Sequence, residues 1–224
     1  MRGWLENTLA EFAADNSELR GASERLLDRI LPDRNLHAKF LNTLSLLEHM
    51  GSHKIMSTQH SAHIDEFTLR HVAEEAHHAF FMKHQAEKVG ASACDYSDEH
   101  LLAPATARMY FQRLEAGLVR RLAAVPNRRA AYLYMSMIVE FRALWFYELY
   151  QECLRRHDID VSLKRILGEE QNHLDEMAQR LAADGHLDSE LVRDALQLER
   201  RLYKRMISAM SVAVGAHGTS GLAA

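Results

Sequence analysis

Hydrophobic residues recur along most of this chain at every third or fourth position, which is the spacing of one face of an α-helix. No segment alternates between hydrophobic and polar residues with the period of two that a half-buried strand requires. The pattern predicts helices over about residues 3–31 (as one helix or two), 36–55, 62–89, 104–124, 129–156, 161–183 and 189–214. The predicted fold class is therefore all-α.

Helix-breaking residues are scarce, with three prolines and ten glycines among 224 residues. Pro32 ends the first helical segment, Gly90 is predicted to be a C-cap, and Pro104 opens a helix in its first turn. The other predicted breaks are residues 57–61, 91–102, 126–127, 157–160 and 184–185. Since no low-complexity linker divides the chain, we predict one domain over residues 1–214, followed by a disordered tail over 215–224.

Composition and charge exclude some partners. Hydrophobic residues make up 47% of the chain and charged residues 26%, which is ordinary for a globular protein. The net charge is −4, and lysine and arginine are scattered, so no nucleic-acid surface is indicated. The most apolar stretch, residues 133–150, contains three charged side chains and does not resemble a membrane span of roughly 20 apolar residues. We expect neither nucleic acid nor a membrane as a partner.

The cysteines and the N-terminus bear on the compartment. Cys94 and Cys153 belong to no paired motif, which indicates free thiols in a reducing compartment. The first residues contain no apolar core followed by a cleavage site, so no signal peptide is expected. These features predict a cytoplasmic protein.

One arrangement of carboxylates and imidazoles occurs twice: a single glutamate in an apolar helical stripe, followed in the next predicted helix by a Glu-x-x-His pair. The first copy consists of Glu48, Glu75 and His78, and the second of Glu140, Glu170 and His173. Residues three apart share a helix face, so each Glu-x-x-His pair can hold one metal ion with both side chains. In both copies the predicted turn lies midway between the two glutamates, which would place them level on antiparallel helices.

The first copy has two possible registers, because residues 74–78 read Glu-Glu-Ala-His-His. The face through Glu75 and His78 continues with apolar residues, whereas the face through Glu74 and His77 continues with charged and polar ones. Helices bury their apolar face, so Glu75 and His78 are predicted to point inward. His71 lies on the same inward face, one turn before Glu75. It is either a further metal ligand or a core histidine beside the ligands.

A purely structural reading is the alternative for each residue taken alone. A buried glutamate can pair with lysine or arginine, and a buried histidine can be a hydrogen-bonded core group. An unpaired buried carboxylate is costly, and metal coordination is one of the few ways to offset that cost. Structural zinc prefers cysteine and histidine. A carboxylate-rich set with two histidines favours iron or manganese.

This ligand set resembles that of the ferritin-like di-iron carboxylate superfamily, over about residues 36–183. The resemblance implies an antiparallel four-helix bundle with additional N-terminal, crossover and C-terminal helices. It also implies two iron ions, or one iron and one manganese, held by the six residues, with Glu75 and Glu170 as bridging carboxylates. Some di-iron arylamine oxygenases look similar in having an extra histidine ligand at a spacing like that of His71.

The resemblance further implies an oxidase or oxygenase that activates dioxygen to oxidise a small organic substrate. The metal ligands would be the only catalytic groups, no other cofactor is expected, and a homodimer is a reasonable expectation. The additional helices distinguish the chain from storage ferritins, and the lack of cysteine pairs distinguishes it from rubrerythrins. Two alternatives stay open: a ferroxidase or peroxide-scavenging protein without an organic substrate, and a metal-free helical interaction protein. The substrate, the electron donor and the choice of metal are not predicted.

Overall fold

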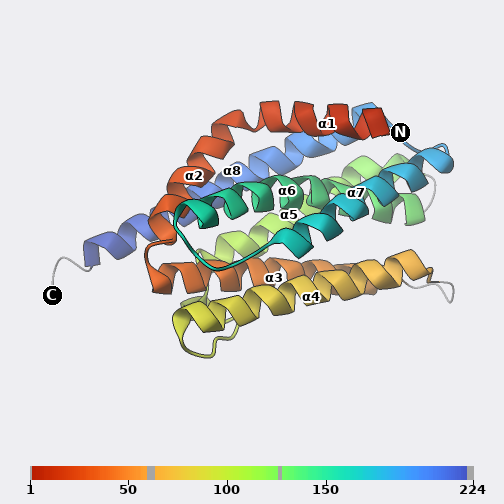
Figure 1. Cartoon of the computed structure of the whole chain (residues 1–224). Helices are drawn as coiled ribbons and strands as arrows, with labels where there is room; N and C mark the ends of the chain where they lie inside the picture. Colours follow the sequence, from red (N-terminus) through yellow and green to blue (C-terminus); the bar gives the residue numbers. More distant parts are fainter. Residues whose placement is uncertain (1, 60–63, 126–127, 221–224) are drawn as a thin grey trace. The chain divides into compact units, whose positions relative to one another are not determined.

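The computed structural model describes residues 2–59, 64–125 and 128–220, and within these ranges it contains helices and no β-strand (Figure 1). The α-helices are α1 (Arg2–Asp15), α2 (Ser17–Ile30), α3 (Arg34–Thr58), α4 (Glu66–Gly90), α5 (Pro104–Arg121), α6 (Arg128–Arg156), α7 (Lys164–Ala183) and α8 (Ser189–Ser220). Two short 3-10 helices are η1 (Asp98–His100) and η2 (Leu122–Ala124). The all-α prediction is confirmed. The ferritin-like four-helix arrangement stays a prediction.

Aspartate side chains begin the two helices that carry the first predicted ligands. Asp33 precedes α3 and accepts hydrogen bonds from the backbone N–H groups of Asn35 and Leu36. Asp65 precedes α4 and accepts from the backbone N–H of Thr68. Each cap satisfies N–H groups that have no partner inside the helix, and this fixes where the helix starts.

The end of α4 differs from the prediction. Gly90 was predicted to be the C-cap, but it is the last helical residue, and Ala91 takes the left-handed conformation at φ 56°. Packing favours glycine at position 90 for a different reason. A Cβ there would lie 3.0 Å from the Cβ of Ala38, so a side chain would require α3 or α4 to shift by a few tenths of an ångström.

Two other predictions concern turns and the C-terminal end. The helix α8 continues to Ser220 and so includes part of the segment predicted to be a disordered tail, while residues 221–224 lie outside the described residues. At the predicted break over residues 57–61, α3 continues to Thr58, and residues 60–61 lie outside the described residues. The predicted break at residues 126–127 also lies outside them. None of the described helices combines the length and apolar composition needed to cross a bilayer.

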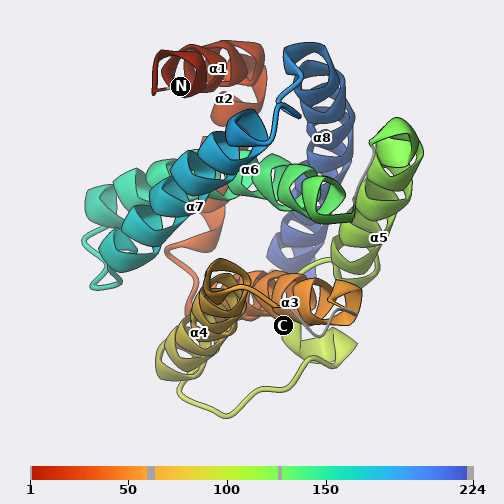
Figure 2. The ribbon, with the colours of Figure 1, turned by 90° about the vertical axis from the view of Figure 1, so that its right-hand side faces the viewer.

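The chain divides into two compact units. One consists of Met1–Glu24 and Gln112–Lys204, and we call it the α6–α7 unit; the other consists of Arg25–Phe111 and Arg205–Ala224, and we call it the α3–α4 unit. Within the α3–α4 unit, α3 packs along α4, and within the α6–α7 unit, α6 packs along α7 (Figures 1 and 2). Each unit therefore contains one of the two helix hairpins that the sequence predicted to carry ligands. The single domain over residues 1–214 stays a prediction.

Candidate metal centre

The first cluster of buried acids and imidazoles lies in the α3–α4 unit. Glu48 on α3 and Glu75 and His78 on α4 each offer a donor atom, and these atoms all lie within 4.8 Å of one another. Oε1 of Glu75 is 3.8 Å from Nδ1 of His78. All three side chains are buried. We call these residues, together with His71, the Glu48 cluster.

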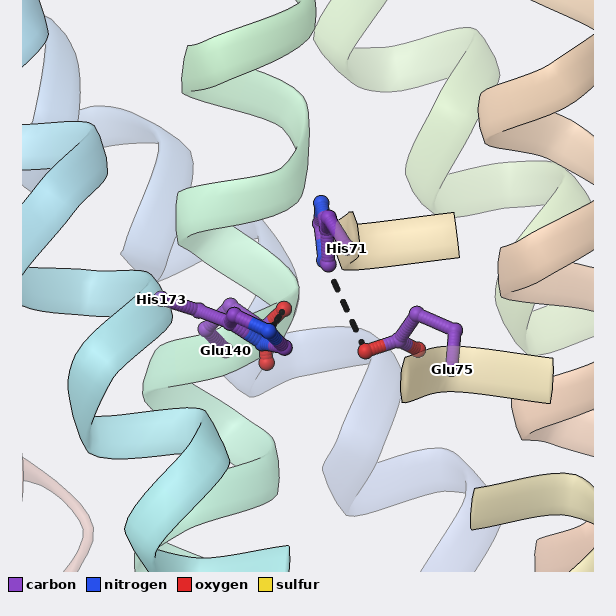
Figure 3. A group of neighbouring side chains, drawn as sticks. All are labelled: His71, Glu75, Glu140 and His173. Atoms are coloured by element: carbon purple, nitrogen blue, oxygen red, sulfur yellow. Dashed lines mark ion pairs between the residues drawn. The ribbon is translucent and has the colours of Figure 1, made fainter. Parts of the chain in front are cut away.

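His71 lies one turn before Glu75 on α4, and its Nε2 is 3.5 Å from Oε1 of Glu75 (Figure 3). Its ring is almost completely buried, with the ring of Phe67 at a centroid distance of 5.9 Å. The prediction that His71 faces inward is confirmed. Its position fits both open readings, a further ligand and a core histidine beside the ligands.

The second cluster lies in the α6–α7 unit and consists of Glu140 on α6 and Glu170 and His173 on α7. Nδ1 of His173 is 3.4 Å from Oε1 of Glu140 and 3.4 Å from Oε2 of Glu170. All three side chains are buried, and Figure 3 shows the Glu140 carboxylate beside the His173 ring. We call them the Glu140 cluster. Both hairpins thus bring their two glutamates level with each other, as the position of the predicted turns required.

The local charge in the Glu140 cluster is negative. Burial acts to lower the pKa of His173, but hydrogen bonds and charges from Glu140 and Glu170 outweigh burial and raise this pKa to about 12. Two carboxylates around one buried imidazole therefore hold a cation strongly. In the metal-free protein that cation is a proton on His173.

The apolar stripe of α4 sets which Glu-x-x-His register faces inward. Glu75 and His78 are buried, whereas Glu74 and His77 are partly exposed. Glu74 lies 4.0 Å from the guanidinium of Arg70 at the surface. The choice of the inward register from the sequence is confirmed. Leu47, next to Glu48, is only partly buried. Five other apolar residues, each within four positions of a predicted ligand, are buried: Leu44, Met82, Phe141, Leu144 and Met177.

The donor set of each cluster fits a transition-metal ion. Donor atoms bound at about 2.1 Å to one ion lie roughly 3–4 Å apart. The separations of 3.4 Å in the Glu140 cluster and 3.8 Å between Glu75 and His78 are in that range, so binding needs only small side-chain movements. Carboxylates mixed with imidazole suit iron or manganese. That these residues bind metal stays a prediction.

Arg142 is a residue whose role the sequence did not reveal. It is buried, and its Nε and Nη2 donate to the two oxygens of Glu199 at 2.9 and 2.7 Å. Nη2 also donates to Oδ1 of Asn16 at 2.7 Å. Rings of Phe12, Trp145 and Tyr203 surround the guanidinium at 4.7, 4.7 and 4.0 Å. These contacts join α6 to α1 and α8, and so fix the part of α6 that carries Glu140.

The residues that accept hydrogen bonds from Arg142, Glu199 and Asn16, are far away in the sequence, so no local pattern could have identified them. The two clusters, by contrast, follow from helical periodicity. Comparison of the chain with protein-family models, with curated proteins and with solved structures finds no match in any of the three.

Proposed function

We propose that this protein binds two transition-metal ions, both iron or iron with manganese, and acts as an oxidase or oxygenase that uses dioxygen on a small organic substrate. The observation that carries the proposal is the repeated cluster: each helix hairpin buries two glutamates and a histidine whose donor atoms lie within coordination range. Two such coincidences in one chain are hard to explain by packing alone, since buried carboxylates are costly.

The proposal assigns one ion to each cluster. Glu48, Glu75 and His78 supply one set of ligands, and Glu140, Glu170 and His173 the other. Four carboxylates and two imidazoles are the ligand set that helical bundles use to hold a di-metal pair.

The side chains have distinct tasks in this proposal. The carboxylates neutralise the charge of the ions, and His173 gives up the proton that it holds in the metal-free protein. Buried apolar side chains such as Met82 and Met177 limit the access of water. When bound, the ions supply the redox chemistry toward dioxygen.

Anaerobic reconstitution with Fe(II) or with Fe(II) and Mn(II), followed by metal analysis and absorption spectroscopy before and after exposure to oxygen, tests the proposal. We expect about two ions per chain and a spectral change on oxidation. Repeated oxidation of added Fe(II) beyond the bound ions would indicate a ferroxidase instead. Absence of bound metal, with stability unaffected by chelator, would leave the helical interaction protein.

A further inference from the structure

Gly51 lies inside α3, three residues after Glu48, in a position where glycine is unfavourable. Glycine costs helical stability relative to alanine because its backbone loses more conformational freedom on folding. The backbone does not require glycine here, because among the described residues the only glycine with positive φ is Gly185. The reason for glycine at this position must therefore be sought in the space around it.

Packing does not require glycine at this position either. A Cβ built on Gly51 would lie 3.4 Å from Oε2 of Glu75 and 3.9 Å from Cζ of Phe111, which are ordinary van der Waals distances. The contrast with Gly117 is clear, because a Cβ there would lie 2.3 Å from the side chain of Leu198. An alanine would fit at position 51 and would stabilise α3. What glycine provides is unfilled space beside the Glu75 carboxylate.

The room for a methyl group beside Gly51 lies where a partly exposed part of α3 faces a buried carboxylate. Gly51 and Phe111 are partly exposed, whereas Glu75 is buried. All three residues belong to the α3–α4 unit. A small molecule that enters beside Gly51 would pass the edge of the Phe111 ring and reach Oε2 of Glu75.

We propose that Gly51 is an entry port for a ligand of two or three atoms, the size class of dioxygen, with Phe111 as its opposite wall. The proposal rests on the proposed function, because the ligand needs a metal ion held by Glu75. A larger side chain at position 51 would fill the port and leave the ligands of the Glu48 cluster in place.

Azide, a three-atom anion that binds iron and changes its absorption, is the probe. We expect Gly51→Val in the full-length, iron-loaded protein to slow azide binding about tenfold or more, because the added methyl groups overfill the port. Gly51→Ala should slow it by a smaller factor. Iron content should stay at the wild-type level in both variants. The matched control is Gly168→Ala on α7, where a Cβ would meet nothing within 4 Å, and azide binding should not change.

A second variant separates blockage from a general disturbance. Shortening the opposite wall in Gly51→Val/Phe111→Ala should recover most of the azide binding rate, which a merely misfolded centre would not do. The melting temperature of metal-free Gly51→Ala gives a readout that does not depend on iron. We expect it to rise by about 2–4 °C, the shift that 1 kcal/mol produces in a chain of this size.

The outcomes are distinguishable. A wild-type rate of azide binding to iron-loaded Gly51→Val would overturn the port and leave the proposed function intact. A lower melting temperature of Gly51→Ala would show that packing requires glycine, and would also overturn the port. A wild-type protein that binds no iron would overturn the proposed function, and the port with it.

Discussion

His173 on α7 and Glu140 on α6 meet with Nδ1 and Oε1 only 3.4 Å apart, although 33 positions separate them in the sequence. Glu170 approaches the same nitrogen at 3.4 Å. This is the geometry of a site that needs a positive charge. A proton supplies it in the metal-free protein, and a metal ion is the other candidate.

The chain contains its own control for the ligand assignment. Glu75/His78 and Glu74/His77 have the same spacing on α4, but only the first pair is buried. We predict that His78→Ala and Glu75→Ala each lose at least one of about two bound metal ions, because each removes a ligand. His77→Ala and Glu74→Ala should keep both ions. Metal analysis of the four variants after the same reconstitution gives the answer, and equal loss in the inner and outer variants would argue against the assignment.

Metal should also stabilise the fold. A ligand that binds only the folded state adds about 2.7 kcal/mol at a free concentration of 100 times its Kd, which is roughly 5–10 °C in Tm for a chain of this size. We predict that chelator lowers the Tm of the metal-loaded wild-type protein by that amount. His78→Ala should respond much less. Calorimetry with and without chelator is the measurement, and an unchanged wild-type Tm would contradict a metal centre that is part of the folded state.

Arg142 should matter for stability far more than surface arginines do. Arg142→Ala leaves Glu199 buried without its guanidinium partner, which we predict to cost about 3–5 kcal/mol. Arg20, whose partner Glu152 is exposed, is the matched control, and Arg20→Ala should cost no more than about 1 kcal/mol. Urea denaturation measures both. A loss below about 1 kcal/mol for Arg142→Ala would show that the buried pair does not hold α1 and α8 to α6.

The burial of His37 should make the stability of the protein depend on pH. This side chain is buried in the first turns of α3, and burial lowers its pKa from 6.5 to about 4. Below pH 6.5 the unfolded chain therefore takes up a proton that the folded protein does not, so stability falls as the pH drops from 6.5 to 4. The loss amounts to about 3 kcal/mol at most. Urea denaturation at pH 7, 6 and 5 should show a smaller loss for His37→Gln than for the wild-type protein. Equal losses would mean that other groups cause the acid sensitivity.

Helical periodicity accounts for what the sequence could predict. The apolar stripe of α4 identified Glu75 and His78 as the inward pair, because side-chain direction in a helix repeats every 3.6 residues. The prediction that Gly90 is the C-cap of α4 was wrong. The glycine lies close to Ala38 of α3, and such a contact depends on how two helices pack, which the sequence of α4 alone does not show. Arg142 was missed for the same reason, because its partner lies 57 positions away. Gly51 has no side chain and therefore does not contribute to a hydrophobic or ligand pattern. Its contacts with Glu75 and Phe111 can be found only in the structure.

The location of the bound ions tests the central claim most directly. Crystals of the protein reconstituted with iron, measured on both sides of the iron absorption edge, give the positions of iron from anomalous scattering. We predict one peak beside Glu48, Glu75 and His78 and another beside Glu140, Glu170 and His173. Iron-loaded crystals with no peak at either cluster, or with peaks only at surface histidines such as His77, would contradict the proposed centre.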